Sequence, residues 1–107
     1  MDEEKSTLIK VSTIQTLNYP SFSFSIVLDD QMCVIDVEQK GSGLYVSLVC
    51  DKVTVFSGVL ADNLTPLPPF SSKDFKGKLF FVDTMGELPP EVEGLGERWQ
   101  LYYCRET

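Results

Sequence analysis

The sequence has no histidine, few basic residues and no long apolar run. Without histidine, the chain lacks the commonest general base and the commonest ligand of transition metals, so triads and dyads built on imidazole are excluded. Cysteine is scarce as well: Cys33, Cys50 and Cys104 are odd in number and have no C-x-x-C spacing. We expect three reduced thiols that pack as small apolar groups, and no metal or other cofactor.

Basic residues are outnumbered by acidic ones, nine to sixteen, which gives a formal net charge of -7. A protein with this charge repels phosphate backbones and anionic lipid headgroups, so nucleic acid and membranes are poor partners. No apolar run reaches the roughly 20 residues that a membrane-spanning helix needs. The start, Met1 to Lys5, is acidic where a secretory signal is basic and then apolar, so we expect a soluble protein made in a cytoplasm.

The sequence does have apolar residues that recur at every second position, in short runs separated by turn residues. This pattern is typical of antiparallel strands. The clearest run extends from Ser21 to Leu28, and Asp29-Asp30 then predicts a tight turn into a partner strand. These patterns predict an all-β fold, a small antiparallel barrel or sandwich of about seven strands, in one domain over residues 1–107. Residues 1–6 are expected to be a flexible N-terminus. The expected strands cover residues 8–14, 21–28, 31–39, 44–50, 53–56, 79–84 and 98–104.

The last of these strands predicts part of the core. Alternation puts Trp99, Leu101 and Tyr103 on one face of it. Because large aromatic side chains dominate the cores of small domains, we expect Trp99 to be buried.

Two long loops interrupt the strands, at residues 62–76 and 85–96. A sheet with short turns needs neither loop for its own pairing, and long ordered loops usually carry function. We therefore predict that Phe70, Phe75 and Leu88 are apolar anchors for a binding partner.

One string resembles part of an enzyme. Residues 79–86 read Leu-Phe-Phe-Val-Asp-Thr-Met-Gly, which is similar to the apolar strand and Asp-Thr-Gly turn of retroviral-type aspartic proteases. In those enzymes, two such turns from a dimer bring together two carboxylates that share one proton. Met85 separates Thr84 from Gly86 and displaces the glycine, so we favour a strand end followed by a turn. A homodimeric protease that uses Asp83 is kept as an alternative.

The order of several motifs resembles the baseplate plug proteins of contractile-tailed bacteriophages, over nearly the whole chain. Residues 24–31 are similar to the hairpin of that family, residues 43–48 to its Gly-Leu-Tyr strand, and residues 58–62 to its Gly-x-x-Leu segment. Residues 77–86 match Gly-x-Leu-x-Phe-x-Asp-x-x-Gly, and residues 95–103 match Leu-Gly-x-Arg-x-x-Leu-x-Tyr. The structural positions in these last two segments are Gly77, Asp83, Gly86, Leu95, Gly96, Arg98, Trp99 and Tyr102.

This resemblance implies a structural virion protein without enzymatic activity. It implies a place at the centre of the tail baseplate, where the protein helps to close the hub or tail tube until infection. Hub, spike or tube subunits are then the partners, several copies around the tail axis are allowed, and synthesis takes place in the cytoplasm of the bacterial host. A second alternative stays open as well, a cytoplasmic adaptor or inhibitor domain of a phage or bacterium that is unrelated to virions.

Overall fold

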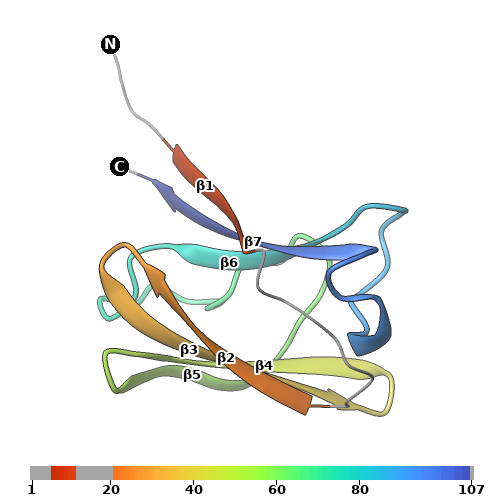
Figure 1. Cartoon of the computed structure of the whole chain (residues 1–107), viewed down its shortest axis with the longest axis horizontal. Helices are drawn as coiled ribbons and strands as arrows, with labels where there is room; N and C mark the ends of the chain where they lie inside the picture. The colour runs from red at the N-terminus through yellow and green to blue at the C-terminus, as the bar shows by residue number, and fades with distance from the viewer. Residues whose placement is uncertain (1–5, 12–20, 107) are drawn as a thin grey trace.

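The computed structural model describes residues 6–11 and 21–106, which form seven strands in two antiparallel sheets (Figure 1). One sheet has three strands in the order β1-β7-β6, and the other has four in the order β2-β3-β4-β5. The two sheets lie as separate layers of a sandwich, so the prediction of an all-β fold is confirmed. The strands are β1 (Ser6–Val11), β2 (Ser21–Leu28), β3 (Gln31–Lys40), β4 (Gly43–Cys50), β5 (Val53–Leu60), β6 (Lys78–Asp83) and β7 (Trp99–Glu106), and a 3₁₀ turn, η1 (Val92–Gly94), precedes β7.

The first strand was expected to cover residues 8–14, and the structure describes it as β1, which ends at Val11. Residues 12–14 lie outside the described part of the chain. The same holds for residues 1–5 of the terminus that was expected to be flexible, whereas Ser6 already belongs to β1.

The β5 strand is longer than expected, since it continues from Phe56 to Leu60. Its register against β4 shifts twice, and Gly58 has a φ of 63°. These irregularities are typical of β-bulges, which bend a strand without ending it. As a result, the consecutive residues Val55 and Phe56 are both buried, which breaks the alternation from which the strand was predicted.

Tight turns set the register of the four-stranded sheet. Asp29 and Asp30 join β2 to β3 with φ values of 51° and 65°, and Asp51 and Lys52 join β4 to β5 with values of 49° and 70°. Positive φ at both central residues is the requirement of the hairpin turns whose twist matches that of the strands, and aspartate tolerates it. The register that follows places Cys33, Ile35 and Val37 of β3 in the core, beside Leu44, Val46, Leu48 and Cys50 of β4.

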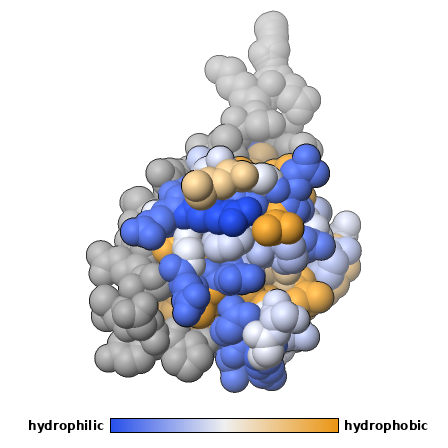
Figure 2. All heavy atoms as spheres, turned by 90° about the vertical axis from the view of Figure 1, so that its right-hand side faces the viewer, coloured by the Kyte–Doolittle hydropathy of each residue, from blue (hydrophilic) through white to orange (hydrophobic). Residues whose placement is uncertain are grey.

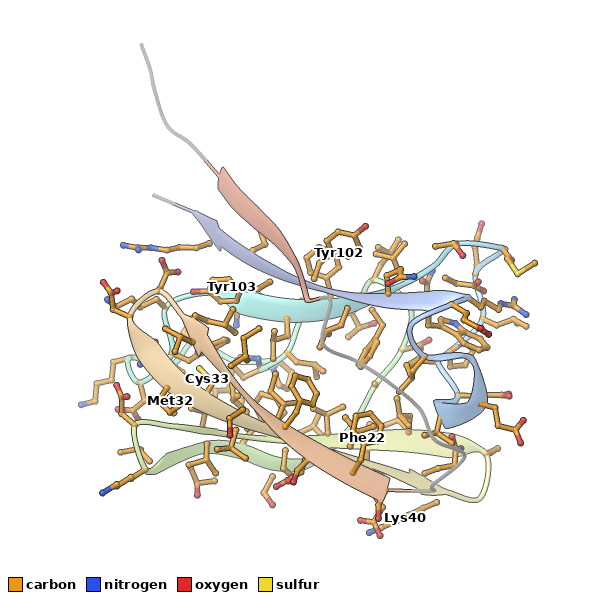
Figure 3. The ribbon with its side chains drawn as sticks, viewed as in Figure 1. Phe22, Met32, Cys33, Lys40, Tyr102 and Tyr103 are labelled. Carbon is orange, nitrogen blue, oxygen red and sulfur yellow. The ribbon has the colours of Figure 1, made fainter. Side chains whose placement is uncertain are left out.

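The core lies between the two sheets. Trp99 is 5% exposed and Tyr103 is 0% exposed, so the predicted burial of Trp99 is confirmed. Figure 3 shows Tyr103 and Cys33 between the sheets, whereas the neighbouring Tyr102 projects from the outer face. There its ring stacks on Phe80 with the ring centroids 5.8 Å apart.

Asp29 connects the two sheets at one end of the sandwich. Its carboxylate accepts hydrogen bonds from the hydroxyl of Tyr103 and, at 2.8 Å, from the guanidinium of Arg105. The Tyr103 hydrogen bond lowers the pKa of Asp29 most, and Arg105 lowers it further against the opposing effect of burial. With this end closed by a charged network, the opposite end of the sandwich is where the β6–β7 loop is presented (Figure 1).

Candidate interaction surfaces

Asp83 holds both ends of the loop between β6 and β7, residues 84–98. Its carboxylate accepts two hydrogen bonds from Arg98, at 2.7 Å from Nε and 2.8 Å from a terminal nitrogen. It also accepts the backbone N–H groups of Met85 and Leu88, each at 2.9 Å. The Asp83 side chain is 0% exposed, so these donors replace water entirely. The loop is thereby fixed to the end of the strand in one shape.

The same contacts keep Asp83 ionised. The Arg98 guanidinium has the largest effect and lowers the pKa of Asp83; burial opposes it, and the N–H groups of Leu88 and Met85 lower the pKa further. In an aspartic protease, one of the two carboxylates must carry a proton at the working pH. Asp83 has a fully buried side chain, and donors of its own chain occupy both of its oxygens, so it is not free to share a proton with a second carboxylate. The geometry therefore argues against the protease alternative.

The middle of loop 84–98 is anchored on the core. Trp99 donates a hydrogen bond from Nε1 to the carbonyl oxygen of Leu88 at 3.0 Å. Gln39 of β3 accepts the N–H of Val92 through Oε1 at 2.9 Å. At Gly94 an added Cβ would lie 2.3 Å from the Trp99 ring, so this close approach requires glycine. The tryptophan thus supports both the backbone and the 3₁₀ turn of the loop.

Most of the other motif residues also shape this loop. Leu95 is buried at 2% exposure, and Gly96 has a φ of 86° and donates its N–H to the carbonyl oxygen of Trp99 at 2.8 Å. At Gly86, by contrast, an added Cβ would come no closer than 3.4 Å to its neighbours. Tyr102 lies apart on the outer face of the sheet. The loop shape therefore depends on glycine at position 96 more than at position 86.

Held in this shape, loop 84–98 presents two apolar side chains to solvent. Met85 is 76% exposed and Leu88 is 56% exposed. Arg98 is paired with Asp83, so the exposed charged residues of this loop are all acidic. Figure 2, which looks at the side of the molecule where this loop lies in Figure 1, shows a largely hydrophilic surface with small hydrophobic areas. The exposed acidic residues of the loop are Glu87, Glu91, Glu93 and Glu97.

Loop 61–77, which joins β5 to β6, behaves differently. Phe70 is 49% exposed, but Phe75 is only 3% exposed and its ring centroid lies 5.4 Å from that of Tyr103. The chain can turn inward there because Gly77 lies against β7, where a Cβ would be 2.4 Å from the carbonyl oxygen of Cys104. Phe75, expected as an exposed anchor, is therefore a core residue in this structure.

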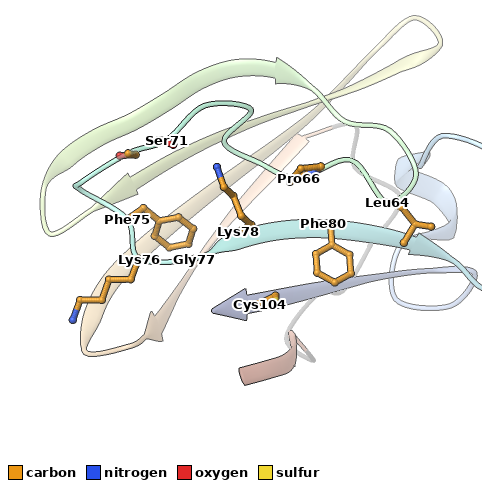
Figure 4. A pocket seen from close by; sticks show the side chains of 10 residues that line it. Leu64, Pro66, Ser71, Phe75, Lys76, Gly77, Lys78, Phe80 and Cys104 are labelled. Atoms are coloured by element: carbon orange, nitrogen blue, oxygen red, sulfur yellow. The ribbon is translucent and has the colours of Figure 1, made fainter. Parts of the chain in front are cut away.

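Between loop 61–77 and strands β6 and β7 the structure has an open hollow of about 660 Å³ (Figure 4). Lys78 spans part of it, because its ammonium donates hydrogen bonds to the carbonyl oxygens of Pro68 and Phe70, both at 2.7 Å. None of the lining residues is a carboxylate, so the hollow offers no pair of carboxylates for acid–base chemistry. The lining residues are Leu64, Pro66, Ser71, Ser72, Phe75, Lys76, Gly77, Lys78, Phe80 and Cys104.

The predicted anchors do not form one patch. The carbonyl oxygen of Phe70 accepts a hydrogen bond from Lys78, the first residue of β6. The N–H of Leu88 donates one to Asp83, the last residue of the same strand. A strand of six residues is about 17–20 Å long, so the two exposed anchors lie far apart. Met85, the most exposed large apolar residue in the described part of the chain, was not among the predicted anchors. Its signal was an apolar residue directly after a strand end, in an otherwise acidic loop.

A family model described as cyanophage baseplate Pam3 plug gp18 matches residues 11–106. The chain belongs to this baseplate plug family. The resemblance inferred from the motifs is thus confirmed, and membership of the plug family supports a structural role in a phage baseplate. No match was found among curated proteins. In this plug protein, the segment from Gly77 to Tyr103 holds loop 84–98 against the core, chiefly through Asp83, Arg98 and Trp99.

Two further properties of the plug protein concern what it could bind. Within residues 6–11 and 21–106, no helix is long and apolar enough to cross a bilayer. In the same part of the chain, no three His, Cys, Asp or Glu side chains are grouped so that they could hold a metal ion.

Proposed function

We propose that this protein plugs the central hub or tail tube in the baseplate of a contractile-tailed phage, after synthesis in the bacterial cytoplasm. The observation that carries the proposal is loop 84–98, which exposes Met85 and Leu88 while Asp83 and Trp99 form hydrogen bonds with its backbone. Membership of the plug family supports the baseplate as the place of action. The function is mechanical and needs contacts rather than catalysis.

The chemistry of loop 84–98 defines the kind of partner that it fits. Apolar side chains on an ordered backbone make good anchors, because little conformational entropy is lost when they are bound. The surrounding glutamates favour a partner whose apolar pocket is bordered by lysine or arginine. We assign this partner to the hub, spike or tube subunits of the baseplate.

Phe70 is proposed as a second, separate contact. Because it lies at the opposite end of β6 from Leu88, a single copy has anchors facing two neighbours. Such a copy can bridge two subunits, and this arrangement is compatible with several copies around the tail axis. Phe75 is not part of the proposal, since it is buried against Tyr103.

Size and charge support a position at the end of a tube. The radius of gyration is 13.4 Å, and the extents of the molecule are 43 × 31 × 23 Å. A formal net charge of -7 disfavours attachment to DNA, so a plug of this kind does not retain DNA that passes it.

The test is assembly of phage particles that carry the double variant Met85→Ser, Leu88→Ser. We expect a folded protein that is absent from purified tails. The matched control is Val27→Ser, Met32→Ser, which removes two apolar residues of similar exposure, 58% and 52%, on the four-stranded sheet. Normal incorporation of the loop variant would overturn the proposed surface. Absence of the unaltered protein from purified particles, as judged by mass spectrometry, would instead favour a cytoplasmic adaptor.

A further inference from the structure

Two buried cysteines face each other on the two central strands of the four-stranded sheet, near the end where β4 turns into β5. Cys33 of β3 and Cys50 of β4 are directly paired in the register, and their Sγ atoms lie 3.1 Å apart. Their exposed fractions are 0% and 1%. Both are free thiols in this structure, and Figure 3 shows Cys33 pointing into the space between the sheets. Neither residue belongs to the loops that carry the proposed docking contacts.

The backbone around this pair has the geometry of a non-hydrogen-bonded pair. The N–H of Asp51 donates to the carbonyl oxygen of Met32 at 2.9 Å, so a ladder hydrogen bond lies just outside the two cysteines. In an antiparallel sheet, the Cα atoms of such a pair are about 4.5 Å apart. The Cα atoms of disulfide-bonded cysteines are about 4.4–6.8 Å apart, so this pair falls within their range. Small rotations of the two side chains are enough to bring the sulfur atoms from 3.1 Å to bonding distance.

We infer that Cys33 and Cys50 are a modification site, a thiol pair that is reduced during assembly and becomes a cross-strand disulfide in the released particle. The inference rests on the proposed function, because a virion protein leaves the reducing cytoplasm for oxidising surroundings, whereas a cytoplasmic adaptor does not. The bond joins residues 17 positions apart in sequence and closes the β3–β4 hairpin into a loop. Closing such a loop restricts the unfolded chain and stabilises the sheet.

The co-reactant is a low-molecular-weight disulfide such as oxidised glutathione. One cysteine thiolate attacks a sulfur of the reagent, which forms a mixed disulfide and releases one glutathione thiolate. The second cysteine thiolate then attacks the protein sulfur of the mixed disulfide, forms the bond between Cys33 and Cys50, and releases the second glutathione. The two protein thiols lose two protons and two electrons in total, and the reagent is reduced to two thiols.

Burial makes this reaction slow in the folded protein. It raises the pKa of both Cys33 and Cys50, so few molecules carry the reactive thiolate. Slow oxidation fits a bond that forms over the life of the particle rather than during its assembly. The chemistry is therefore best tested by refolding, in which the thiols meet the oxidant before they are buried.

The first experiment refolds the reduced, isolated protein in oxidised glutathione and counts thiols after renewed unfolding. We expect the three thiols to fall to one, with Cys33 and Cys50 in a single cross-linked pair of peptides. The Cys104→Ala variant should fall from two thiols to none, whereas Cys33→Ala should form no internal disulfide. Three remaining thiols, stable mixed disulfides, or a bond that includes Cys104 would each overturn the inference.

Stability gives a second readout of the same sample. The oxidised protein should melt about 10 °C above the reduced protein, and dithiothreitol should reverse the shift. Cys33→Ala should melt at one temperature under both conditions. Equal melting temperatures for the oxidised and reduced protein would show that the bond does not stabilise the sheet.

The final experiment separates this inference from the proposed function. Purified particles are unfolded in N-ethylmaleimide, and the cysteine peptides are mapped beside those of infected cells that were lysed and unfolded in the same reagent. We expect the disulfide between Cys33 and Cys50 in particles and three alkylated cysteines in cells. If particles contain the protein with all three cysteines alkylated, the disulfide is contradicted but the proposed function is not. Particles without the protein contradict the proposed function, whatever the refolding experiment shows.

Discussion

The two long loops precede and follow β6 in the chain, but they direct their apolar side chains differently. Loop 84–98 is fixed through its backbone, by Asp83 and Trp99, and turns Met85 and Leu88 toward solvent. Loop 61–77 is also held through its backbone, by hydrogen bonds from Leu64 and Leu67 to β6, but it turns Phe75 into the core. A place in a long loop therefore does not by itself make an apolar residue available to a partner, since Phe75 is 3% exposed and Leu88 is 56% exposed.

The largest effect is expected when the support of loop 84–98 is removed. Trp99→Ala deletes a buried ring and the hydrogen bond to Leu88, so we expect a loss of about 3–5 kcal/mol in the free energy of unfolding. Urea unfolding followed by circular dichroism measures this, since the variant has no tryptophan for fluorescence. The control Trp99→Phe keeps most of the packing and should lose clearly less. An unchanged stability of Trp99→Ala would mean that the indole does not support the loop.

In loop 61–77, the two phenylalanines should behave as opposites. Phe75→Ala should cost about 3 kcal/mol, because it leaves a cavity beside Tyr103. Phe70→Ala should change the free energy of unfolding by less than about 0.5 kcal/mol, since half of its side chain is exposed. Both values come from urea unfolding followed by the fluorescence of Trp99. Equal losses for the two variants would remove the distinction between a core residue and an exposed anchor.

The ion pair of Asp83 should make the anchoring of loop 84–98 dependent on pH. Because the pKa of Asp83 is lowered in the folded state, its contribution is complete above the ordinary value of 3.8 and is lost as the pH falls below it. Asp83→Asn keeps the shape but not the charge, so we expect it to be less stable than the unaltered protein near neutral pH. The difference should shrink when urea unfolding is repeated at increasingly acidic pH below 3.8. A difference that stays constant over the whole range would show that the charge of Asp83 is not what anchors the loop.

Alternation and turn chemistry were enough to predict the strands and the buried face of β7, because each strand has one face toward the core. They failed at β5, where bulges make Val55 and Phe56 face the same side. The inward direction of Phe75 was equally beyond prediction, since it depends on a close approach of Gly77 to a strand distant in sequence. Asp83 and Arg98 were recognised as motif residues, but their contact across loop 84–98 became visible only in three dimensions.

Leu88 should contribute least to stability, although its proposed effect on assembly is large. Leu88→Ser removes an exposed side chain but keeps the N–H that Asp83 accepts and the carbonyl oxygen that Trp99 reaches. We therefore expect a change within about 0.5 kcal/mol in the free energy of unfolding. Leu88→Pro is the matched control, because it abolishes that N–H and should lower the stability and shift the fluorescence of Trp99. A loss for Leu88→Ser as large as that for Phe75→Ala would place Leu88 in the core. If its stability is unchanged, failure of Leu88→Ser to enter tails reports a lost contact with the partner and not an unfolded plug.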